Sequence, residues 1–336
     1  MYKFLLLPFA IAYWLVIEFR YLFYRFGLFK SHKFSVPIIS VGNIVVGGAG
    51  KTPCILSLVQ LLKSRGKRVA VVYRGYKRLS KEEVLPVQLD HGANHYGDEA
   101  YLCKFHYPDI PVYVGAKRAD VIRKLLAEHE VDVVLMDDAF QHLAVQRDVD
   151  ICLIDASEIA SAYKLLPLGR MREPWRALKR ASDVVVSKTN FKDSTKALRE
   201  HIFKKLGLSV KLTFAYEFHS FCPLEMWIKK DFTIYQIDHK QKYHLVSGIA
   251  KPAQLLDCLE EVLPKENLEV VAYADHYAFS EKNLSHIQGP ILVSEKDAIK
   301  IMDLKLDKSK IFVVRSKVKW NLSEDEVYEH FHRQLS

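Results

Sequence analysis

Residues 36–53 read Val36-Pro-Ile-Ile-Ser-Val-Gly-Asn-Ile-Val-Val-Gly-Gly-Ala-Gly-Lys-Thr-Pro53. The stretch begins as a short apolar run, breaks into glycines and continues into a pattern of apolar residues at helical spacing. A strand that ends in a glycine-rich loop at a helix start is typical of phosphate binding, because backbone N–H groups at a helix N-terminus attract anions. We therefore predict a strand, a phosphate loop and a helix here.

The loop Gly47-Gly48-Ala49-Gly50 lets the backbone approach a phosphate chain closely, and these residues are the predicted nucleotide-binding segment. Lys51 is expected to reach the β- and γ-phosphates, and the Thr52 hydroxyl to bind Mg²⁺. The longer form of the motif would have glycine where this chain has Val45. The alternative interpretation is a glycine-rich turn in an unrelated α/β domain.

A second motif is the hydrophobic run Val131–Asp138, which ends in Asp137 and Asp138. In phosphate-loop enzymes a strand of this kind runs beside the loop strand, and its terminal aspartate binds Mg²⁺ directly or through water. The pair of motifs is more specific than either alone. Both aspartates are therefore candidate metal ligands.

Further strands are predicted at residues 68–73, 150–155 and 183–190, the last with a polar end, and they alternate with helical patterns. This alternation predicts a doubly wound α/β sandwich. Arg74 follows the first of these strands, at the sheet edge where ligands bind. Ser187-Lys-Thr-Asn190 is the polar end of the last, and either frames a nucleotide base or is a plain connection.

Between residues 215 and 230 the sequence changes to alternating segments that are broken by turns, and a second series of strand and helix patterns follows. We predict a membrane-anchoring helix at 1–30, a phosphate-loop core at 35–215 and a smaller α/β domain at 216–336, whose C-terminal segment can return to the core. Asp98 and Glu99 open a helix, where they serve either the helix dipole or chemistry.

The N-terminus is apolar and uncharged from Phe4 to Ile17, and basic and aromatic residues follow. Phe4–Ile17 is too short to cross a bilayer as a helix, whereas an extension to Tyr24 includes Glu18 and Arg20. We predict a membrane anchor that either spans or lies on the membrane. A helix packed on the protein's own core is the alternative.

Composition sets broader limits. The chain has 336 residues, 49% of them hydrophobic, with a formal net charge of +9, which favours an anionic partner. The 5 cysteines are scattered, so neither a disulfide framework nor a zinc site is indicated. Outside the N-terminus there is no interleaved aromatic and basic pattern, which argues against nucleic acid. No obligate protein partner is inferred.

Taken together, the motifs resemble the tetraacyldisaccharide 4'-kinase family of lipid A biosynthesis. The matching segments run in the family's order along the chain: Ser40–Ile44, Val46–Pro53, Arg74–Tyr76, Gly97–Glu99, Met136–Asp138, Gln141–His142, Gln146–Asp148, Leu166–Pro167, Arg172–Pro174, Ser247–Ala250 with Pro252, Asp275–His276 and Glu295–Asp297.

The resemblance implies transfer of the ATP γ-phosphate to the 4'-hydroxyl of tetraacyldisaccharide 1-phosphate, which forms lipid IVA at the cytoplasmic face of the inner membrane. It implies two α/β/α domains joined by linker strands, with the site in the cleft between them. Asp98 and His276, one from each predicted domain, would form a dyad that takes the hydroxyl proton. Glu99 would join the Mg²⁺ ligands.

The same resemblance makes Arg74, Arg118 and Arg172 candidates to contact the anionic glycolipid or the nucleotide. The expected cofactors are ATP and Mg²⁺, and the expected surface partner is the membrane. A different membrane-associated phosphate-loop NTPase, such as a GTPase switch, remains the alternative. Acyl-chain selectivity, oligomeric state and the role of Ser187–Asn190 are not predicted.

Overall fold

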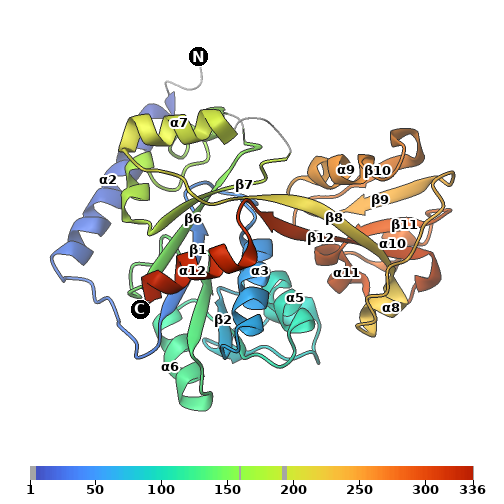
Figure 1. Ribbon diagram of the computed structural model, residues 1–336, viewed down its shortest axis with the longest axis horizontal. Helices are drawn as coiled ribbons and strands as arrows, with labels where there is room; N and C mark the ends of the chain where they lie inside the picture. The colour runs from blue at the N-terminus through green and yellow to red at the C-terminus, as the bar shows by residue number, and fades with distance from the viewer. Residues whose placement is uncertain (1–4, 159, 191–194, 336) are drawn as a thin grey trace. The chain divides into compact units, whose positions relative to one another are not determined.

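The computed structural model describes residues 5–158, 160–190 and 195–335, and Figure 1 labels most of its helices and strands. The chain forms two compact units. The first comprises Met1–Arg74, Gly115–Ala215 and Lys319–Ser336, and the second comprises Gly75–Val114 and Tyr216–Val318. These units group residues 75–114 with the C-terminal half, unlike the domain bounds predicted from the sequence. Residues 1–4 of the predicted anchor lie outside the described residues.

The first unit is built on a parallel sheet with the strand order β8-β7-β6-β1-β5-β2. Its strands are β1 (Ile38–Asn43), β2 (Val69–Tyr73), β5 (Val133–Asp137), β6 (Val149–Asp155), β7 (Asp183–Ser187) and the beginning of β8 (Thr213–Pro223). All residues of β1, β2, β5 and β6 are buried, as expected for strands covered on both faces.

The strand order reverses at β1, which lies between β5 and β6. The chain leaves β1 toward β2 and β5, and later continues on the other side through β6 and β7. In open α/β sheets such a switch point creates a crevice at the carboxyl ends of the strands, where ligands bind. The phosphate loop follows β1 directly, so the topology positions it at this crevice.

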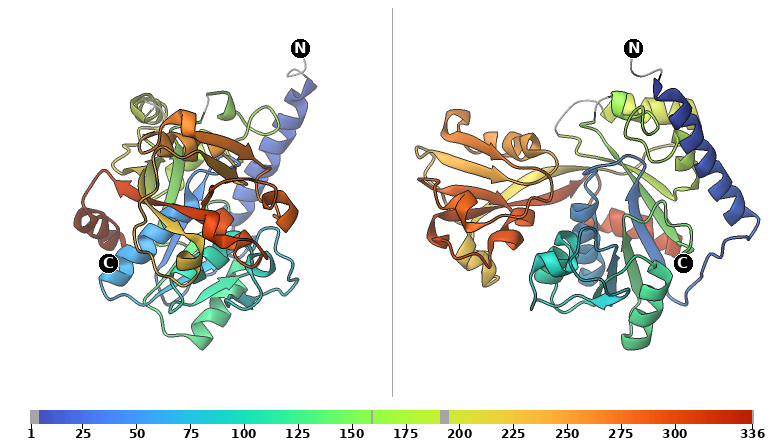
Figure 2. Two further views of the ribbon diagram at one scale, coloured as in Figure 1. Left: turned by 90° about the vertical axis from the view of Figure 1, so that its right-hand side faces the viewer. Right: turned by 180° about the vertical axis from the view of Figure 1, so that it is seen from behind.

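Helices of the first unit are α2 (Leu7–Arg25), α3 (Lys51–Ser64), α6 (Arg118–Glu128), α7 (Thr195–Leu206) and α12 (Glu324–Leu335), with 3-10 turns η1 (Ala160–Ala162) and η2 (Trp175–Arg180). Helix α12 packs against α3, and the Trp320 indole nitrogen, just before it, donates to the Ser57 hydroxyl of α3 at 2.9 Å. Figure 2 shows α2 running along the outside of this unit.

The second unit contains the parallel strands β10-β9-β11-β12, with β8 next to β12. Their bounds are β9 (Tyr243–Ser247), β10 (Leu268–Ala272), β11 (Ile291–Ser294) and β12 (Ile311–Trp320), and the short antiparallel pair is β3 (Leu85–Pro86) with β4 (Val112–Val114). The chain passes from one unit to the other within β8 and again within β12.

Helices of the second unit are α4 (Ala93–Tyr96), α5 (Asp98–His106), α8 (Leu224–Ile228), α9 (Pro252–Glu260), α10 (Glu281–Leu284) and α11 (Glu295–Ile301), with 3-10 turns η3 (Lys265–Asn267) and η4 (Lys308–Lys310). Buried apolar side chains of β9, α9 and β11, among them Leu245, Leu259 and Leu292, form its core. The prediction of an α/β fold built on a doubly wound sheet is confirmed, because both units are α/β and the first has this sheet topology.

Candidate active site

The phosphate loop connects β1 to α3 in the way the sequence predicts. Gly47 has φ +122° and Gly50 has φ +90°, a region that side-chain-bearing residues rarely adopt. Gly50 is the N-cap of α3, so the helix N-terminus begins at the loop. Val45 is buried and forms an isolated bridge with Met171. The valine that stands in place of the glycine of the longer motif therefore packs in the interior of the unit.

Lys51 and Asp138 lie close together at the carboxyl end of the sheet. The Lys51 Nζ is 3.5 Å from Asp138 Oδ1 and 3.4 Å from the side-chain oxygen of Asn43. Arg172 approaches the same carboxylate with both terminal nitrogens, at 2.7 Å and 3.1 Å, and also donates to the Asn43 side chain. Two cations thus surround one carboxylate next to the phosphate loop.

Electrostatics keep Asp138 ionised. Burial raises the pKa of its carboxyl, but Lys51 and Arg172 together act more strongly, and the net pKa lies well below its usual range. Its backbone is in the left-handed region, with φ +48°. A non-glycine residue in this conformation needs support from its surroundings, and the bidentate contact with Arg172 supplies it.

The loop is also held from its other side. The Ser187 hydroxyl donates to the Ala49 carbonyl at 2.8 Å. Lys188, which is 3% exposed, donates to the Gly48 carbonyl and pairs with Asp155 at 2.9 Å. These contacts fix two carbonyls of the loop, those of Gly48 and Ala49.

A second polar cluster lies within the second unit. His276 follows β10, and its Nδ1 is 3.0 Å from Asp98 Oδ2 at the start of α5. Its Nε2 is 3.8 Å from Glu99, which pairs with Lys296 at 2.7 Å. The backbone of His276 is left-handed, with φ +59°, and its N–H donates to the Gly248 carbonyl.

Lys300 is a buried cation that contacts this cluster. Its buried Nζ is 3.0 Å from Asp297 and 3.7 Å from Asp98. Burial raises the pKa of Asp98, but the hydrogen bond from His276 and the charge of Lys300 outweigh this, and the net pKa is lowered. Asp98 is therefore an anion that can orient the imidazole of His276.

Comparison with known proteins shows the family of this chain. Residues 2–336 match the family model of LpxK, tetraacyldisaccharide-1-P 4'-kinase. This chain belongs to that family. Curated tetraacyldisaccharide 4'-kinases from Bdellovibrio bacteriovorus and Flavobacterium johnsoniae are 32% and 35% identical to it, over 88% and 90% of this chain and 89% and 88% of theirs.

The crystal structure of LpxK from Aquifex aeolicus in complex with ATP matches this fold with a TM-score of 0.80 and 28% identity, covering 100% of both chains. The family, the fold class and the kinase activity predicted from the sequence are confirmed, as is the use of ATP. The roles of individual residues in this tetraacyldisaccharide 4'-kinase family member remain predictions.

The predicted site residues fall into both units. Thr52, Asp137 and Asp138 belong to the first unit, whereas Glu99 belongs to the second. Among the described residues, no cluster of three or more His, Cys, Asp or Glu side chains forms a metal site. Mg²⁺ often binds through one or two carboxylates together with substrate phosphates. The carboxylates of Asp137 and Asp138 and the Thr52 hydroxyl are oxygen donors of the kind that this pattern needs.

The three predicted substrate arginines have different surroundings. Arg74 is exposed at the end of β2. Arg118 is 2% exposed and donates to the Gly115 carbonyl at 2.6 Å and to the Asp137 carbonyl at 3.4 Å. Arg172 contacts Asp138. Of these, Arg172 has the most direct connection to the phosphate loop.

Several residues of the site were missed by sequence reasoning. Asn43 ends β1, and its side-chain oxygen is shared by Lys51 and Arg172. The sequence predicts either base framing or a plain connection for the segment that contains Lys188, yet its ammonium group donates to the Gly48 carbonyl of the phosphate loop. A usable signal was present: polar residues at the carboxyl ends of buried parallel strands, which converge on one sheet edge.

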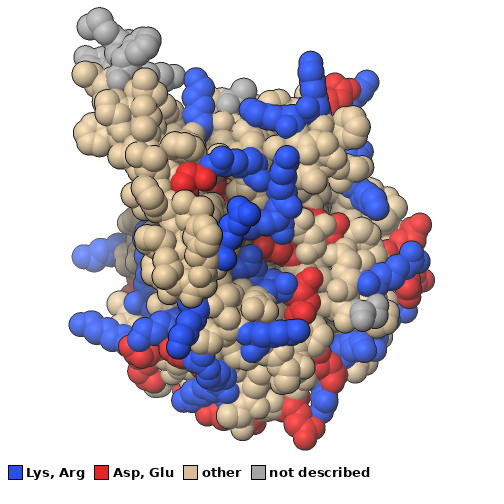
Figure 3. Space-filling model, turned by 90° about the vertical axis from the view of Figure 1, so that its left-hand side faces the viewer, with Lys and Arg blue, Asp and Glu red and all other residues tan. Residues whose placement is uncertain are grey.

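The N-terminal helix α2 is long and apolar enough to cross a membrane, by length and composition only. It has large exposed apolar side chains on its outer side, including Phe9, Ile11, Val16 and Phe19. Figure 3 shows this surface with Lys and Arg side chains beside it.

Proposed function

We propose that this protein transfers the γ-phosphate of ATP to the 4'-hydroxyl of tetraacyldisaccharide 1-phosphate, forming lipid IVA. Membership of the tetraacyldisaccharide-1-P 4'-kinase family supports the reaction. The observation that carries the assignment of residues is the pairing of Lys51 and Arg172 with Asp138 beside the phosphate loop. The hydrogen bond between His276 and Asp98 supports the assignment of the base.

The first group of residues binds the nucleotide. The loop Gly47-Gly48-Ala49-Gly50 binds the phosphate chain through its backbone, and Lys51 neutralises charge on the β- and γ-phosphates. The side chains of Thr52, Asp137 and Asp138, together with Glu99, are the proposed ligands of Mg²⁺. When bound, this ion supplies charge stabilisation for the phosphates as the γ-phosphoryl group is transferred.

The second group activates the sugar hydroxyl. Asp98 accepts the Nδ1–H of His276, which leaves Nε2 as the proton acceptor. The 4'-oxygen attacks the γ-phosphorus and its proton passes to Nε2. The bond between the γ-phosphorus and the bridging oxygen breaks, and ADP leaves with the electron pair.

Arg74, Arg118 and Arg172 are proposed to help bind the anionic groups of the substrate or the nucleotide. Burial favours an indirect role for Arg118, through the carbonyl of Asp137. The exposed end of β2 favours a direct contact for Arg74.

We further propose that α2 anchors the enzyme to the cytoplasmic face of the inner membrane. Its exposed apolar side chains and the net charge of +9 favour an anionic bilayer surface. The glycolipid substrate is itself a membrane component, so the anchor holds the enzyme where its substrate lies.

The test is transfer of labelled γ-phosphate from ATP to tetraacyldisaccharide 1-phosphate in detergent, with the wild type and with Asp98→Ala. Labelled lipid from the wild type and almost none from Asp98→Ala supports both the reaction and the base. A folded wild type that makes no labelled lipid refutes the proposal. Competition by GTP in place of ATP would favour a GTPase switch.

A further inference from the structure

Polar side chains on α2 face the protein rather than the outer surface. Tyr13, Arg20 and Tyr21 all bond to residues of the first unit, and Glu18 pairs with Arg176. The spacing of these residues places them on adjoining faces of the helix. An anchor that only held the enzyme to a bilayer would not need these contacts.

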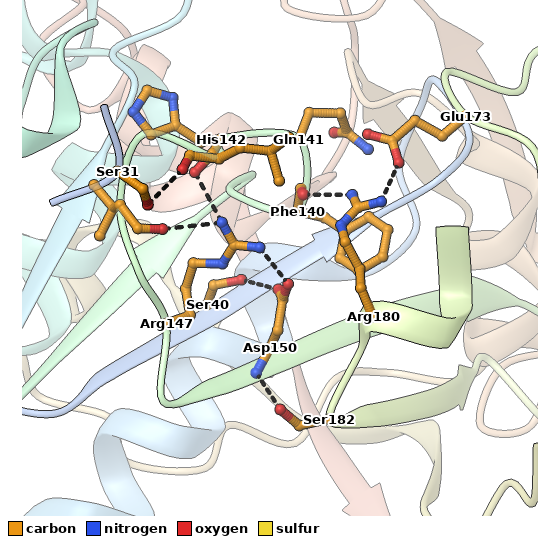
Figure 4. A network of polar contacts seen from close by, with 12 residues as sticks. Ser31, Ser40, Phe140, Gln141, His142, Arg147, Asp150, Glu173, Arg180 and Ser182 are labelled. Carbon is orange, nitrogen blue, oxygen red and sulfur yellow. Dashed lines mark hydrogen bonds and ion pairs between the residues drawn. The ribbon is translucent and has the colours of Figure 1, made fainter. Parts of the chain in front are cut away.

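One contact is with a buried carboxylate. Glu173 is 2% exposed and accepts a hydrogen bond from the Tyr21 hydroxyl. Arg180 pairs with the same carboxylate at 2.6 Å and donates to the Phe140 carbonyl at 2.7 Å. Figure 4 shows Arg180 between Glu173 and Phe140. Tyr21 therefore binds a network that is ordered within the unit.

Another contact is with the residue that precedes Glu173. The Tyr13 hydroxyl donates to the backbone carbonyl of Arg172 at 3.0 Å. The guanidinium of that same residue holds Asp138 with two nitrogens. Two tyrosines of α2 thus bond to the consecutive residues Arg172 and Glu173. The guanidinium of Arg172 contacts the carboxylate of Asp138, which lies next to Lys51.

A third contact reaches the site by a separate path. Arg20 donates to the Gln141 carbonyl, and the Gln141 side chain donates to the carbonyl of Asn43 at 2.9 Å. Asn43 is also the residue shared by Lys51 and Arg172. The polar contacts of α2 therefore converge on the segments that surround the phosphate loop.

We propose that α2 is a positioning element of the kinase as well as its anchor, with Tyr13 and Tyr21 holding the Arg172–Glu173 segment so that the guanidinium stays on Asp138. The inference rests on the proposed role of Asp138 in the nucleotide site. A guanidinium can hold a carboxylate with two nitrogens only within a narrow range of orientations. Tethering the backbone of Arg172 and its neighbour restricts that orientation.

The test removes only hydroxyl groups. Tyr13→Phe, Tyr21→Phe and the double variant keep the rings, while Tyr24→Phe is the matched control on the same helix. Tyr24 contacts Phe29 and Arg20, and its hydroxyl is not part of the Arg172–Glu173 network. The full-length proteins are compared by ATP Kd without lipid substrate, kcat, melting temperature and sedimentation with anionic vesicles.

We expect the double variant to bind ATP severalfold more weakly and to lose about tenfold in kcat, the scale of one or two hydrogen bonds to such groups. The Tyr24→Phe control should match the wild type in every measurement. Vesicle sedimentation of the double variant should also match the wild type, whereas its melting temperature should fall by a few degrees because two hydrogen bonds are lost. Unchanged ATP binding and kcat in the double variant would overturn the inference, as would a loss explained by weaker sedimentation. If the double variant does not fold, the Tyr13→Phe variant provides the same comparison.

An Asp138→Asn variant separates the inference from the function on which it rests. An inactive Asp138→Asn enzyme beside a normal tyrosine double variant refutes only the role of α2. Near wild-type turnover by Asp138→Asn refutes the proposed nucleotide site, and with it the reason for tethering Arg172.

Discussion

Replacement of His276 by asparagine tests the proposed general base most directly. The backbone at His276 has φ +59°, and asparagine is among the residues that tolerate this left-handed region. The substitution therefore keeps the turn after β10 while removing the imidazole nitrogen that accepts the proton. Asp98 loses a hydrogen-bond donor at 3.0 Å, which is expected to cost about 1–3 kcal/mol of folding stability.

The expected kinetic effect is larger than the effect on stability. One general base contributes about 10²–10⁴-fold to a rate, which corresponds to about 3–5 kcal/mol in the activation free energy. Lys51, Asp138 and the phosphate loop lie in the first unit, whereas His276 belongs to the second. The loss should therefore appear in kcat, with the Kd for ATP changed less than about threefold.

The assay is steady-state transfer of labelled phosphate to the lipid, with ATP affinity and melting temperature measured on the same preparations. His244→Asn is the matched control, because His244 lies in the same unit and bonds to the Gln288 carbonyl at 3.0 Å. Asp98→Asn should resemble His276→Asn, since an amide that donates to Nδ1 would leave the proton on Nε2. A kcat for His276→Asn within about threefold of wild type would refute the assignment.

Three further predictions concern the first unit. Lys188→Met should weaken ATP binding by about tenfold, because the Gly48 carbonyl loses its hydrogen bond and Asp155 loses its buried cation. Lys188→Arg should recover part of the affinity for ATP. Equal Kd values for the wild type and Lys188→Met would contradict this prediction. Burial and then the charge of Arg118 lower the pKa of His142 from 6.5 to about 4, so the unfolded chain takes up a proton below pH 6.5 that the folded chain refuses. The free energy of unfolding should fall between pH 6.5 and 4 by about 1–3 kcal/mol more in wild type than in His142→Gln. An equal fall in the two proteins, measured by urea unfolding at each pH, would contradict this prediction. Deletion of residues 1–25 should reduce sedimentation with vesicles yet leave measurable ATP binding, and a truncated protein that still sediments fully would show that the anchor lies elsewhere.

The sequence predicts the phosphate loop well because its function depends on the local order of residue types. Glycines, Lys51 and Thr52 are adjacent, and a buried strand precedes them, so one short window contains the strand, the loop and the helix start. The acidic end of β5 is predictable for the same reason. Each of these features needs no knowledge of distant residues.

Contacts between segments that are far apart in the sequence cannot be predicted from such local patterns. Arg172 lies 34 residues from Asp138 and 129 from Asn43 along the chain, and no periodicity or spacing relates them. His276 and Asp98 are 178 residues apart, and only the family resemblance related them. The grouping of residues 75–114 with the second unit is likewise a property of packing, since these residues lie between two strands of the first unit's sheet in the sequence.

Composition leaves open whether α2 spans the membrane or lies on its surface, and the contacts of its charged residues bear on this choice. In a membrane-spanning helix, Glu18 and Arg20 would each cost about 3 kcal/mol near the bilayer centre. In the folded unit they instead bond to Arg176 and to the Gln141 carbonyl. A span would have to give up these bonds as well as those of Tyr13 and Tyr21. The energetics therefore favour a helix that stays on the kinase core and inserts only its exposed apolar side chains into the membrane surface.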